Sequence, residues 1–418
     1  MNPRVAVSPL APAAFPDLPI VGGVECATFA AGIKRADRAD VALMRLAAGT
    51  SVAGVFTRSA TRSAAVRDCQ AKIAAADAHS AAGGAAIVVN SGNANTFTGA
   101  AGEQAVAAMT RATAACLNID PRRVFSCSTG VIGEPLPHER ILAGLPAACA
   151  ALRPGGLRHA AEAIRTTDTF AKGAGVRLVI KGRPVHIAGI AKGSGMVAPN
   201  MATMLAYLFT DAQVARPLLQ TMLVQLNACT FNRITVEGDT STSDTVLLAA
   251  TGAAGVRVAA DSDSDTTEPF RQALHAVMRD LAHQVVRDGE GATKFVEIRV
   301  MGAASDEDAH IHARAVAQSP LVKTALAGED ANWGRIVMAL GKSGAALQQE
   351  RLRLHLGDIL IAENGAVAAG YSEDRAAAYM KRKELHIAVD LGLAQGEAVV
   401  WTCDLTHDYI TINAGYRS

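Results

Sequence analysis

One threonine of the chain, Thr203, has surroundings that could make its hydroxyl a nucleophile. It follows a glycine-containing segment, residues 192–199, and it begins an apolar run typical of a buried strand. A threonine hydroxyl is a weak nucleophile without a base, but a threonine at the start of a chain can use its own α-amino group as that base. Cleavage between Ala202 and Thr203 would create this group. Taken alone, however, the segment favours an ordinary loop that enters a core strand.

Two hydroxyl-rich segments that precede Thr203 could support such chemistry. In the first, Thr129 and Gly130 stand at a glycine-rich turn, where backbone N–H groups can hold a developing oxyanion. A plain strand-to-loop transition explains the same residues, and the segment alone favours it. In the second, residues 166–169 could hydrogen-bond a polar ligand or cap a turn, and the sequence favours neither.

Polar residues in the second half of the chain could also face a ligand. Glu290 lies between Gly289 and Gly291, whose backbone freedom would let the carboxylate point inward and meet an ammonium group. An isolated loop glutamate is more often solvated. Asn413 and Ser418 follow a predicted strand and could lie across the mouth of a pocket.

Motifs for metals, phosphates and dinucleotides are incomplete in this sequence. Residues 235–245 carry two aspartates among hydroxyls, but they lack the further acidic positions and the terminal glutamate of a calcium loop. We therefore expect a hydrogen-bonded loop beside a pocket. The stretch Gly341-Lys342-Ser343 is no phosphate loop, because Ile336 stands where that motif needs glycine. We expect neither a metal ion nor a bound cofactor.

The composition is that of a globular α/β protein with two or three lobes. Its 40 basic and 39 acidic residues nearly cancel, which argues against nucleic acid and anionic membranes as partners. Seven scattered cysteines indicate free thiols in a reducing compartment rather than a disulfide framework. No run approaches about 18 apolar residues, and the proline-rich start does not resemble a secretory signal. We expect a cytoplasmic protein.

Strand and helix patterns alternate along the chain, as in α/β folds. In the first half we predict strands at 41–46, 52–56 and 85–90, a helix at 101–117, and a hairpin at 176–191 that turns at Lys181-Gly182. In the second half we predict helices at 211–228, capped by Asp211, and at 267–287, a strand at 295–300, helices within 306–340, a hairpin of 385–391 with 398–401, and a strand at 409–412.

Seven segments in a fixed order resemble the ornithine acetyltransferase family of arginine biosynthesis, also called glutamate N-acetyltransferases. They are Ser128–Gly133, Thr166–Thr169, Ala191–Met196, Pro199–Leu205, the Gly238-Asp-Thr-Ser-Thr stretch, Asp288–Lys294 and the terminal Asn413…Ser418. Each segment is weak alone, but the ordered set covers nearly the whole chain and outweighs the plain structural explanations above. Many members of the family end in threonine where Ser418 stands, which keeps a hydroxyl at that position.

The resemblance implies a precursor that cuts itself before Thr203. The products would be an α chain, residues 1–202, and a β chain, residues 203–418, in a fold of mixed sheets layered between helices. Thr203 would then take the acetyl group of N2-acetyl-L-ornithine and pass it to L-glutamate through an acetyl-threonine ester. Some members also use acetyl-CoA as the acetyl donor, and no residue of this chain decides that point. Assembly as α2β2 or larger is expected by analogy.

Site roles carry over to matching positions of this sequence. The resemblance makes Thr129 and Gly130 the oxyanion pair. It makes a further set substrate-binding: Thr166, Lys192, Thr203, Glu290, Asn413 and Ser418. The chemistry agrees, because Lys192 can pair with the substrate carboxylate and Glu290 can meet the side-chain ammonium of ornithine. Which hydroxyl of 166–169 faces the ligand stays open.

Two alternatives remain open on the sequence alone. An N-terminal-nucleophile amidohydrolase or aminopeptidase would share the cleavage and the nucleophile but release its product to water. An amino-acid-binding protein would not be cleaved at all. A denaturing gel separates the latter from both enzymes, because processing gives two fragments of nearly equal length.

Overall fold

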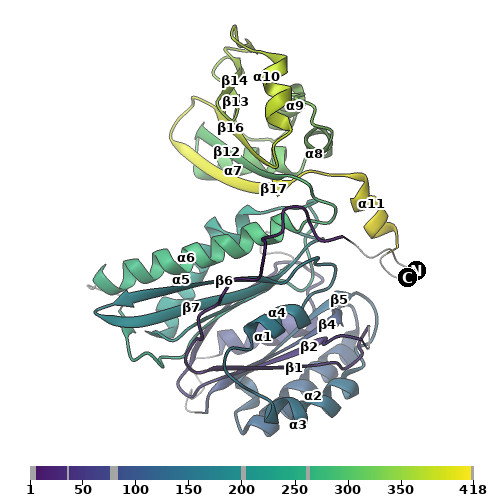
Figure 1. The fold of residues 1–418 in the computed structure, drawn as a ribbon, viewed down its shortest axis with the longest axis vertical. Coiled ribbons are helices and arrows are strands. Elements are labelled where there is room, and N and C mark those ends of the chain that lie inside the picture. The colour runs from purple at the N-terminus through teal and green to yellow at the C-terminus, as the bar shows by residue number, and fades with distance from the viewer. Residues whose placement is uncertain (1–5, 35–36, 76–82, 199–203, 260–263, 416–418) are drawn as a thin grey trace. The chain divides into compact units, whose positions relative to one another are not determined.

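The computed structural model describes the chain except for residues 1–5, 35–36, 76–82, 199–203, 260–263 and 416–418 (Figure 1). The predicted cleavage site, Ala202 and Thr203, and the predicted substrate contact Ser418 therefore lie outside the described residues. The chain forms two compact units. The larger unit comprises Pro12–Asn232 and Asp239–Val285, and the smaller unit comprises Met1–Ala11, Arg233–Gly238 and Val286–Ser418.

The first sheet of the larger unit has four strands in the order β1-β2-β4-β5. The strands are β1 (Val24–Phe29), β2 (Val41–Leu46), β4 (Ala85–Asn93) and β5 (Val124–Val131). The central strand β2 and the first five residues of β4 are mostly apolar and buried, and β4 ends in the polar stretch Asn90–Asn93. Strand β5 runs parallel to β4, and the connection between them is the long helix α2 (Gly99–Leu117).

The second sheet of the larger unit has five strands in the order β3-β10-β8-β7-β6. They are β3 (Ser51–Phe56), β10 (Thr245–Ala250), β8 (Leu205–Thr210), β7 (Arg183–Lys192) and β6 (Lys172–Ile180). The predicted hairpin is confirmed as β6–β7, and its turn has φ of 49° at Lys181 and 75° at Gly182, the positive values of a two-residue hairpin turn. Its register pairs Lys172 with Ala191, so both strands end together.

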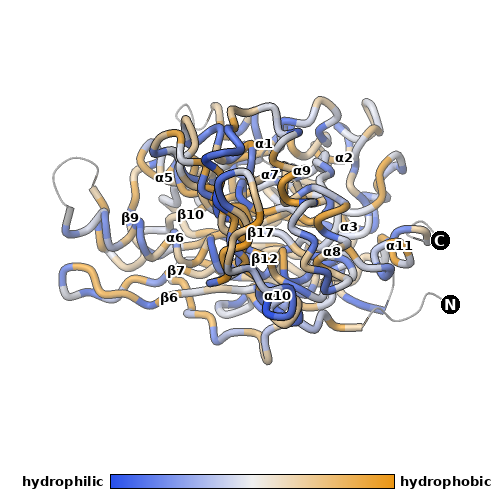
Figure 2. Tube along the Cα trace, turned by 90° about the horizontal axis from the view of Figure 1, so that it is seen from above, coloured by the Kyte–Doolittle hydropathy of each residue, from blue (hydrophilic) through white to orange (hydrophobic). Residues whose placement is uncertain are grey.

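Helices form layers around and between these two sheets (Figure 1). They are α1 (Ala64–Ala74), α2, α3 (His138–Ala150), α4 (Leu157–Ala163), α5 (Arg216–Cys229) and α6 (Ser264–Arg287), the last of which ends in the smaller unit. One apolar core joins inward residues of both sheets with α1 and α4, and a second joins the first sheet with α2 and α3. The predicted layering of mixed sheets with helices is thus confirmed, and it includes an inner helical layer. The tip of the β6–β7 hairpin is hydrophilic (Figure 2).

The smaller unit is built on a six-stranded sheet in the order β15-β14-β13-β16-β12-β17. Its strands are β12 (Phe295–Ala303), β13 (Arg353–Leu356), β14 (Ile359–Glu363), β15 (Ala366–Val367), β16 (Glu384–Asp390) and β17 (Gly396–Cys403). Its helices are α7 (Asp306–Ala317), α8 (Pro320–Ala327), α9 (Gly334–Gly341), α10 (Glu373–Met380) and α11 (His407–Ala414). A separate apolar core fills this unit.

The predicted helix at 211–228 begins later, at Arg216. Gln213–Val214 form the short strand β9, which pairs with β11 (Arg257–Val258). Asp211 is no helix cap, because its carboxylate accepts the backbone N–H of His186 at 2.8 Å. Pro217 stands in the first turn, where proline's missing N–H costs nothing, and it marks the true start.

Two predictions near the end of the chain are wrong. Strands β16 and β17 do not form a hairpin, because β12 lies between them, parallel to β16 and antiparallel to β17. Residues 409–412 are not a strand but belong to helix α11. A short run of apolar and β-branched residues fits either element, and here it forms helix, with no residue of α11 buried.

Candidate active site

Thr129 and Gly130 occupy the end of strand β5. Gly130 has a φ of 135°, and a Cβ atom there would lie 2.3 Å from the carbonyl carbon of Gly92. Only glycine permits this approach of two strand ends, and the parallel register of β4 and β5 becomes irregular at the same point. The role of this pair as an oxyanion hole stays a prediction.

Buried amide side chains fix the loop beside this turn. Asn90 accepts the Ser128 hydroxyl at 2.7 Å and donates to the Asn93 carbonyl oxygen at 2.9 Å. Asn93 in turn donates to the Glu134 carbonyl oxygen at 3.0 Å. Because each of these contacts engages the backbone or a neighbouring polar group, the turn that carries Thr129 is held from both sides.

Lys192 is the last residue of β7, and its ammonium group donates to the Thr166 hydroxyl at 2.7 Å. The Lys192 side chain is only 6% exposed. The structure therefore brings together two of the predicted substrate-binding residues, Thr166 and Lys192. A buried ammonium group beside a hydroxyl is suited to bind a carboxylate.

Asp168 lies beneath this pair and was not singled out from the sequence. Its carboxylate accepts the backbone N–H groups of Thr166 at 2.9 Å and Gly193 at 2.7 Å, and the Lys172 ammonium group at 2.7 Å. Burial alone would raise the pKa of Asp168, but the Lys172 and Lys192 ammonium groups hold it well below its usual value. An aspartate inside the hydroxyl cluster with a lysine four residues later was the signal that could have revealed it.

Asp244 is a second buried carboxyl group that sequence analysis did not single out. Neither of its carboxyl oxygens has a hydrogen-bond partner among the residues that the structure describes. Burial raises the pKa of Asp244 well above its usual value, although the Met204 amide and the Lys192 ammonium group act against the shift. Met204 is the first residue that the structure describes after Thr203.

The loop before β10 connects these features, as expected for a hydrogen-bonded loop. The Thr242 and Thr96 hydroxyls lie 3.1 Å apart, and Thr96 accepts the backbone N–H of Gly133 at 3.0 Å through its carbonyl oxygen. From the same loop, Thr240 donates to the Ala198 carbonyl oxygen at 3.2 Å. The loop thereby ties the turn after β5 to the segment that leads to Thr203.

Glu290 and Asn413 meet in the smaller unit. The Asn413 amide, in α11, donates to a carboxylate oxygen of Glu290 at 2.6 Å. Glu290 is buried, as predicted for a glutamate that points inward. A Cβ atom on Gly291 would lie 2.8 Å from the Tyr409 backbone nitrogen, so glycine is needed where this turn meets the start of α11.

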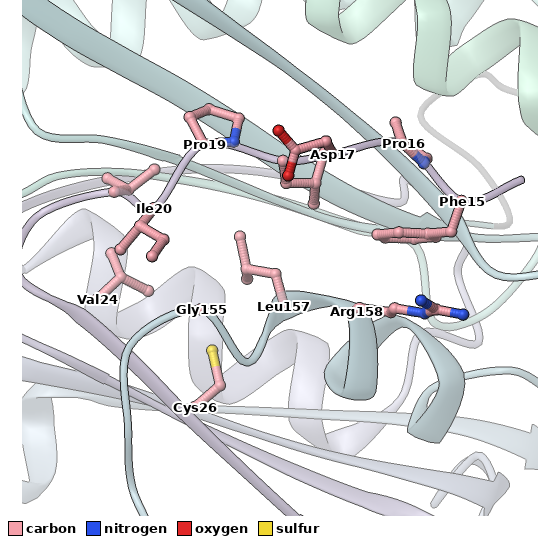
Figure 3. Close-up of a pocket in the computed structure, with 12 residues that line it drawn as sticks. Phe15, Pro16, Asp17, Pro19, Ile20, Val24, Cys26, Gly155, Leu157 and Arg158 are labelled. Carbon is pink, nitrogen blue, oxygen red and sulfur yellow. The ribbon is translucent and has the colours of Figure 1, made fainter.

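A cavity of about 340 Å³ lies elsewhere in the larger unit (Figure 3). The segment Phe15–Ile20 borders it together with Leu157, Arg158 and Cys26, and none of the predicted site residues that the structure describes lines it. Burial raises the pKa of the Cys26 thiol to about 12, which makes it unreactive. We therefore do not assign the active site to this cavity.

The described parts of the chain lack two further kinds of feature. They hold no group of at least three His, Cys, Asp or Glu side chains placed to bind a metal ion. Nor does any helix there combine the length and apolar character needed to cross a bilayer.

Known proteins resemble this chain over nearly its full length. A family model described as the ArgJ family matches residues 25–418. The arginine biosynthesis bifunctional protein ArgJ of Ruegeria pomeroyi is 61% identical over 412 residues, which cover 99% of this chain and 98% of that protein. The protein of the same name from Zymomonas mobilis is 50% identical over 412 residues, 99% of both chains.

Solved structures include the arginine biosynthesis bifunctional protein argJ of Bacillus halodurans. It is 43% identical, covers 51% of this chain and 100% of that chain, and has a TM-score of 0.49.

The family match and the full-length relatives define an acyltransferase of arginine biosynthesis. The chain belongs to the ArgJ family. The resemblance inferred from seven short segments is thereby confirmed, together with the predicted class of enzyme.

Proposed function

We propose that this protein transfers the acetyl group of N2-acetyl-L-ornithine to L-glutamate through an acetyl ester of Thr203, giving ornithine and N-acetylglutamate. The family and the relatives named for arginine biosynthesis support the overall reaction. They do not favour the amidohydrolase alternative. The observation that carries the proposal for this chain is the buried Lys192 ammonium group, hydrogen-bonded to Thr166 at the start of the segment that leads to Thr203.

The nucleophile would arise by self-cleavage. The Thr203 hydroxyl attacks the Ala202 carbonyl carbon, the peptide bond becomes an ester, and water hydrolyses that ester. The products are the α chain 1–202 and the β chain 203–418, which stay together because β7 and β8 are paired strands of one sheet on either side of the cut. The freed α-amino group of Thr203 then serves as the base for its own hydroxyl.

In turnover the site residues would take different roles. Thr129 and Gly130 stabilise the oxyanion of each tetrahedral intermediate, where one donor is typically worth about 3 kcal/mol of barrier. Lys192 and Thr166 bind the substrate carboxylate, and Glu290, held by Asn413, binds the side-chain ammonium group of ornithine. Ser418 completes the substrate contacts.

Intact-mass analysis of the purified protein tests this proposal. We expect two chains, and we expect the β chain to gain about 42 Da, an acetyl group in place of a hydrogen, when N2-acetyl-L-ornithine is added. Adding L-glutamate should remove the extra mass and form N-acetylglutamate. A single unprocessed chain, or acetate released at the same rate with and without glutamate, would contradict the transferase mechanism.

Several finer points complete the proposal. We propose a cytoplasmic location, supported by seven cysteines that are all free thiols in described parts of the chain. We propose assembly of α and β chains as α2β2 or larger, and acetyl-CoA as an additional acetyl donor, a role that the word "bifunctional" in the relatives' names supports. Native mass spectrometry and a glutamate acetylation assay with acetyl-CoA test these two points.

A further inference from the structure

Asp168, Lys172 and Lys192 form a cluster with one carboxylate and two ammonium groups. Asp168 and Lys172 have completely buried side chains, and their charged atoms lie 2.7 Å apart. The Lys192 ammonium group lies 3.8 Å from the other carboxylate oxygen of Asp168. One carboxylate therefore faces two ammonium groups in a place from which water is largely excluded.

The hydrogen bonds show which lysine holds the carboxylate. One oxygen of Asp168 accepts Lys172 and the Gly193 N–H, and the other accepts the Thr166 N–H. Lys192 is too far from Asp168 for a hydrogen bond and donates to the Thr166 hydroxyl instead. Asp168 is thus hydrogen-bonded to Lys172 and not to Lys192. Its carboxylate therefore balances only part of the Lys192 charge.

Asp244 does not change this balance. Asp244 also acts on Lys192, but neither of its carboxyl oxygens forms a hydrogen bond with a residue that the structure describes, and burial raises its pKa well above the usual value. Because Asp244 makes no hydrogen bond to Lys192 and its burial disfavours the charged form, it does little to offset the Lys192 ammonium charge. The remaining positive charge is the one that a bound carboxylate would compensate.

We propose that Lys172 is a positioning residue that sets the specificity of the site for carboxylates, because it occupies Asp168 and so keeps the Lys192 ammonium group available to substrate. This inference rests on the proposed function, in which Lys192 binds the substrate carboxylate. Without Lys172, the buried Asp168 carboxylate would lose its partner and draw in Lys192, whose ammonium group is already within 4 Å. Lys192 would then be neutralised internally.

The test compares two donors, N2-acetyl-L-ornithine and its carboxamide, N2-acetyl-L-ornithinamide. They differ only in the group that Lys192 would bind. In the wild-type enzyme we expect kcat/KM to favour the carboxylate by at least about tenfold, the range of hydrogen bonds that involve a charged group. In Lys172→Met we expect this preference to fall by about tenfold, mainly through KM for the carboxylate, with kcat changed less.

Matched variants separate positioning from general damage. Lys323 is another buried lysine, in the smaller unit, and it donates to Thr402, so Lys323→Met removes a similar group that has its own partners. It should lower stability without changing the preference between the two donors. Lys172→Arg keeps the charge and should retain most of the preference. If Lys172→Met is not processed, Lys172→Gln is measured in its place. Glutamine can donate a hydrogen bond to Asp168 but carries no charge, so Lys192 becomes the only one of the two lysines left to balance Asp168, and the preference should also be lost.

The outcomes distinguish the inference from the proposed function. If the wild-type enzyme prefers the carboxylate and both neutral variants keep that preference, the role of Lys172 is wrong and the proposed reaction stands. If Lys172→Met slows both donors equally, Lys172 is only structural and the inference also fails. If the wild-type enzyme transfers no acetyl group, the proposed function fails first and the inference falls with it.

Discussion

Each unit contains a buried lysine, Lys172 in the larger and Lys323 in the smaller, and these two lysines have different kinds of partner. In the larger unit Lys172 is paired with the buried carboxylate of Asp168, and a second ammonium group, that of Lys192, lies close by. In the smaller unit the buried Lys323 donates to the Cys403 carbonyl oxygen and to the Thr402 hydroxyl, which are neutral groups within the same core. Lys172 therefore has a charged partner that a second ammonium group also approaches, whereas Lys323 is held by neutral hydrogen-bond acceptors.

The carboxyl groups of the two units differ in the same sense. Glu290 of the smaller unit is held by a neutral amide, that of Asn413. In the larger unit the pKa values of Asp168 and Asp244 move in opposite directions, because burial dominates at Asp244 whereas two lysines outweigh it at Asp168. Separated pKa values and unbalanced charge are features of sites that do chemistry. In the part of the chain that the structure describes, Asp168 and Asp244 show this separation, and both belong to the larger unit.

The largest effect should come from the predicted nucleophile. Thr203→Ala removes the hydroxyl that both cleavage and acetyl transfer need, so we expect a single chain on a denaturing gel and no detectable transfer. Thr203→Ser keeps a hydroxyl and should be cleaved and active. A cleaved and active Thr203→Ala protein would overturn the role of Thr203 as the nucleophile.

A large effect is also expected at Gly130. An alanine there would bring its Cβ atom to 2.3 Å from the Gly92 carbonyl carbon, which displaces the turn that carries the oxyanion pair. We expect kcat to fall by about a hundredfold or more, the typical effect of losing an oxyanion donor. Gly133→Ala is the matched control, because Gly133 also has positive φ but a Cβ atom added there would meet nothing within 4 Å. Equal effects of the two variants would contradict the special role of Gly130.

A smaller effect, on substrate binding, is expected at Glu290. Glu290→Gln keeps an oxygen for the Asn413 amide but removes the charge, so KM for N2-acetyl-L-ornithine should rise by about tenfold with little change in kcat. Glu329→Gln serves as control, because Glu329 forms a partly exposed ion pair with Lys294 in the same unit. A fall in kcat with unchanged KM would place Glu290 in the chemistry and break the comparison.

The smallest effect concerns the pH dependence of stability. Because the pKa of Asp244 is raised in the folded state, folding favours its protonated form, and stability declines as pH rises above the unfolded pKa of about 3.9. Asp244→Asn removes this decline, so its Tm relative to wild type should increase between about pH 4 and pH 7, by a few degrees. Asp239→Asn, at an exposed position of the same loop, should show no such trend. A pH-independent difference in Tm for Asp244→Asn would contradict the raised pKa.

Sequence analysis predicted the layered α/β fold and the β6–β7 hairpin, and the resemblance named Thr166 and Lys192, which the structure shows in contact, as substrate-binding residues. It failed where long-range partners decide the outcome. Residues 385–391 and 398–401 are strands as expected, but only the sheet order reveals β12 between them. Asp211 is a residue type that often caps helices, but its carboxylate accepts the backbone N–H of His186, which lies in strand β7.

The pairing of Asp168 with Lys172 was missed for a different reason. Both residues are unremarkable by type, and a lysine and an aspartate four residues apart usually lie in solvent. Complete burial of both side chains is what makes the pair significant, and burial depends on how the larger unit packs. The identities of the site residues can therefore be inferred from the sequence more easily than the balance of charge around them, which depends on burial.

The two lysines of the cluster stand at the open end of a single hairpin, Lys172 as its first residue and Lys192 as its last. Since neighbouring residues on a strand face opposite sides, deleting one residue within β7 would turn Lys192 away from Asp168 while leaving the hairpin itself intact. Matched insertions at the solvent-facing tip would lengthen both arms and leave the open end unchanged. We therefore expect the enzyme to remain active when one residue is inserted into each strand at the tip. We expect it to lose activity when a single residue is deleted from β7 near Lys192.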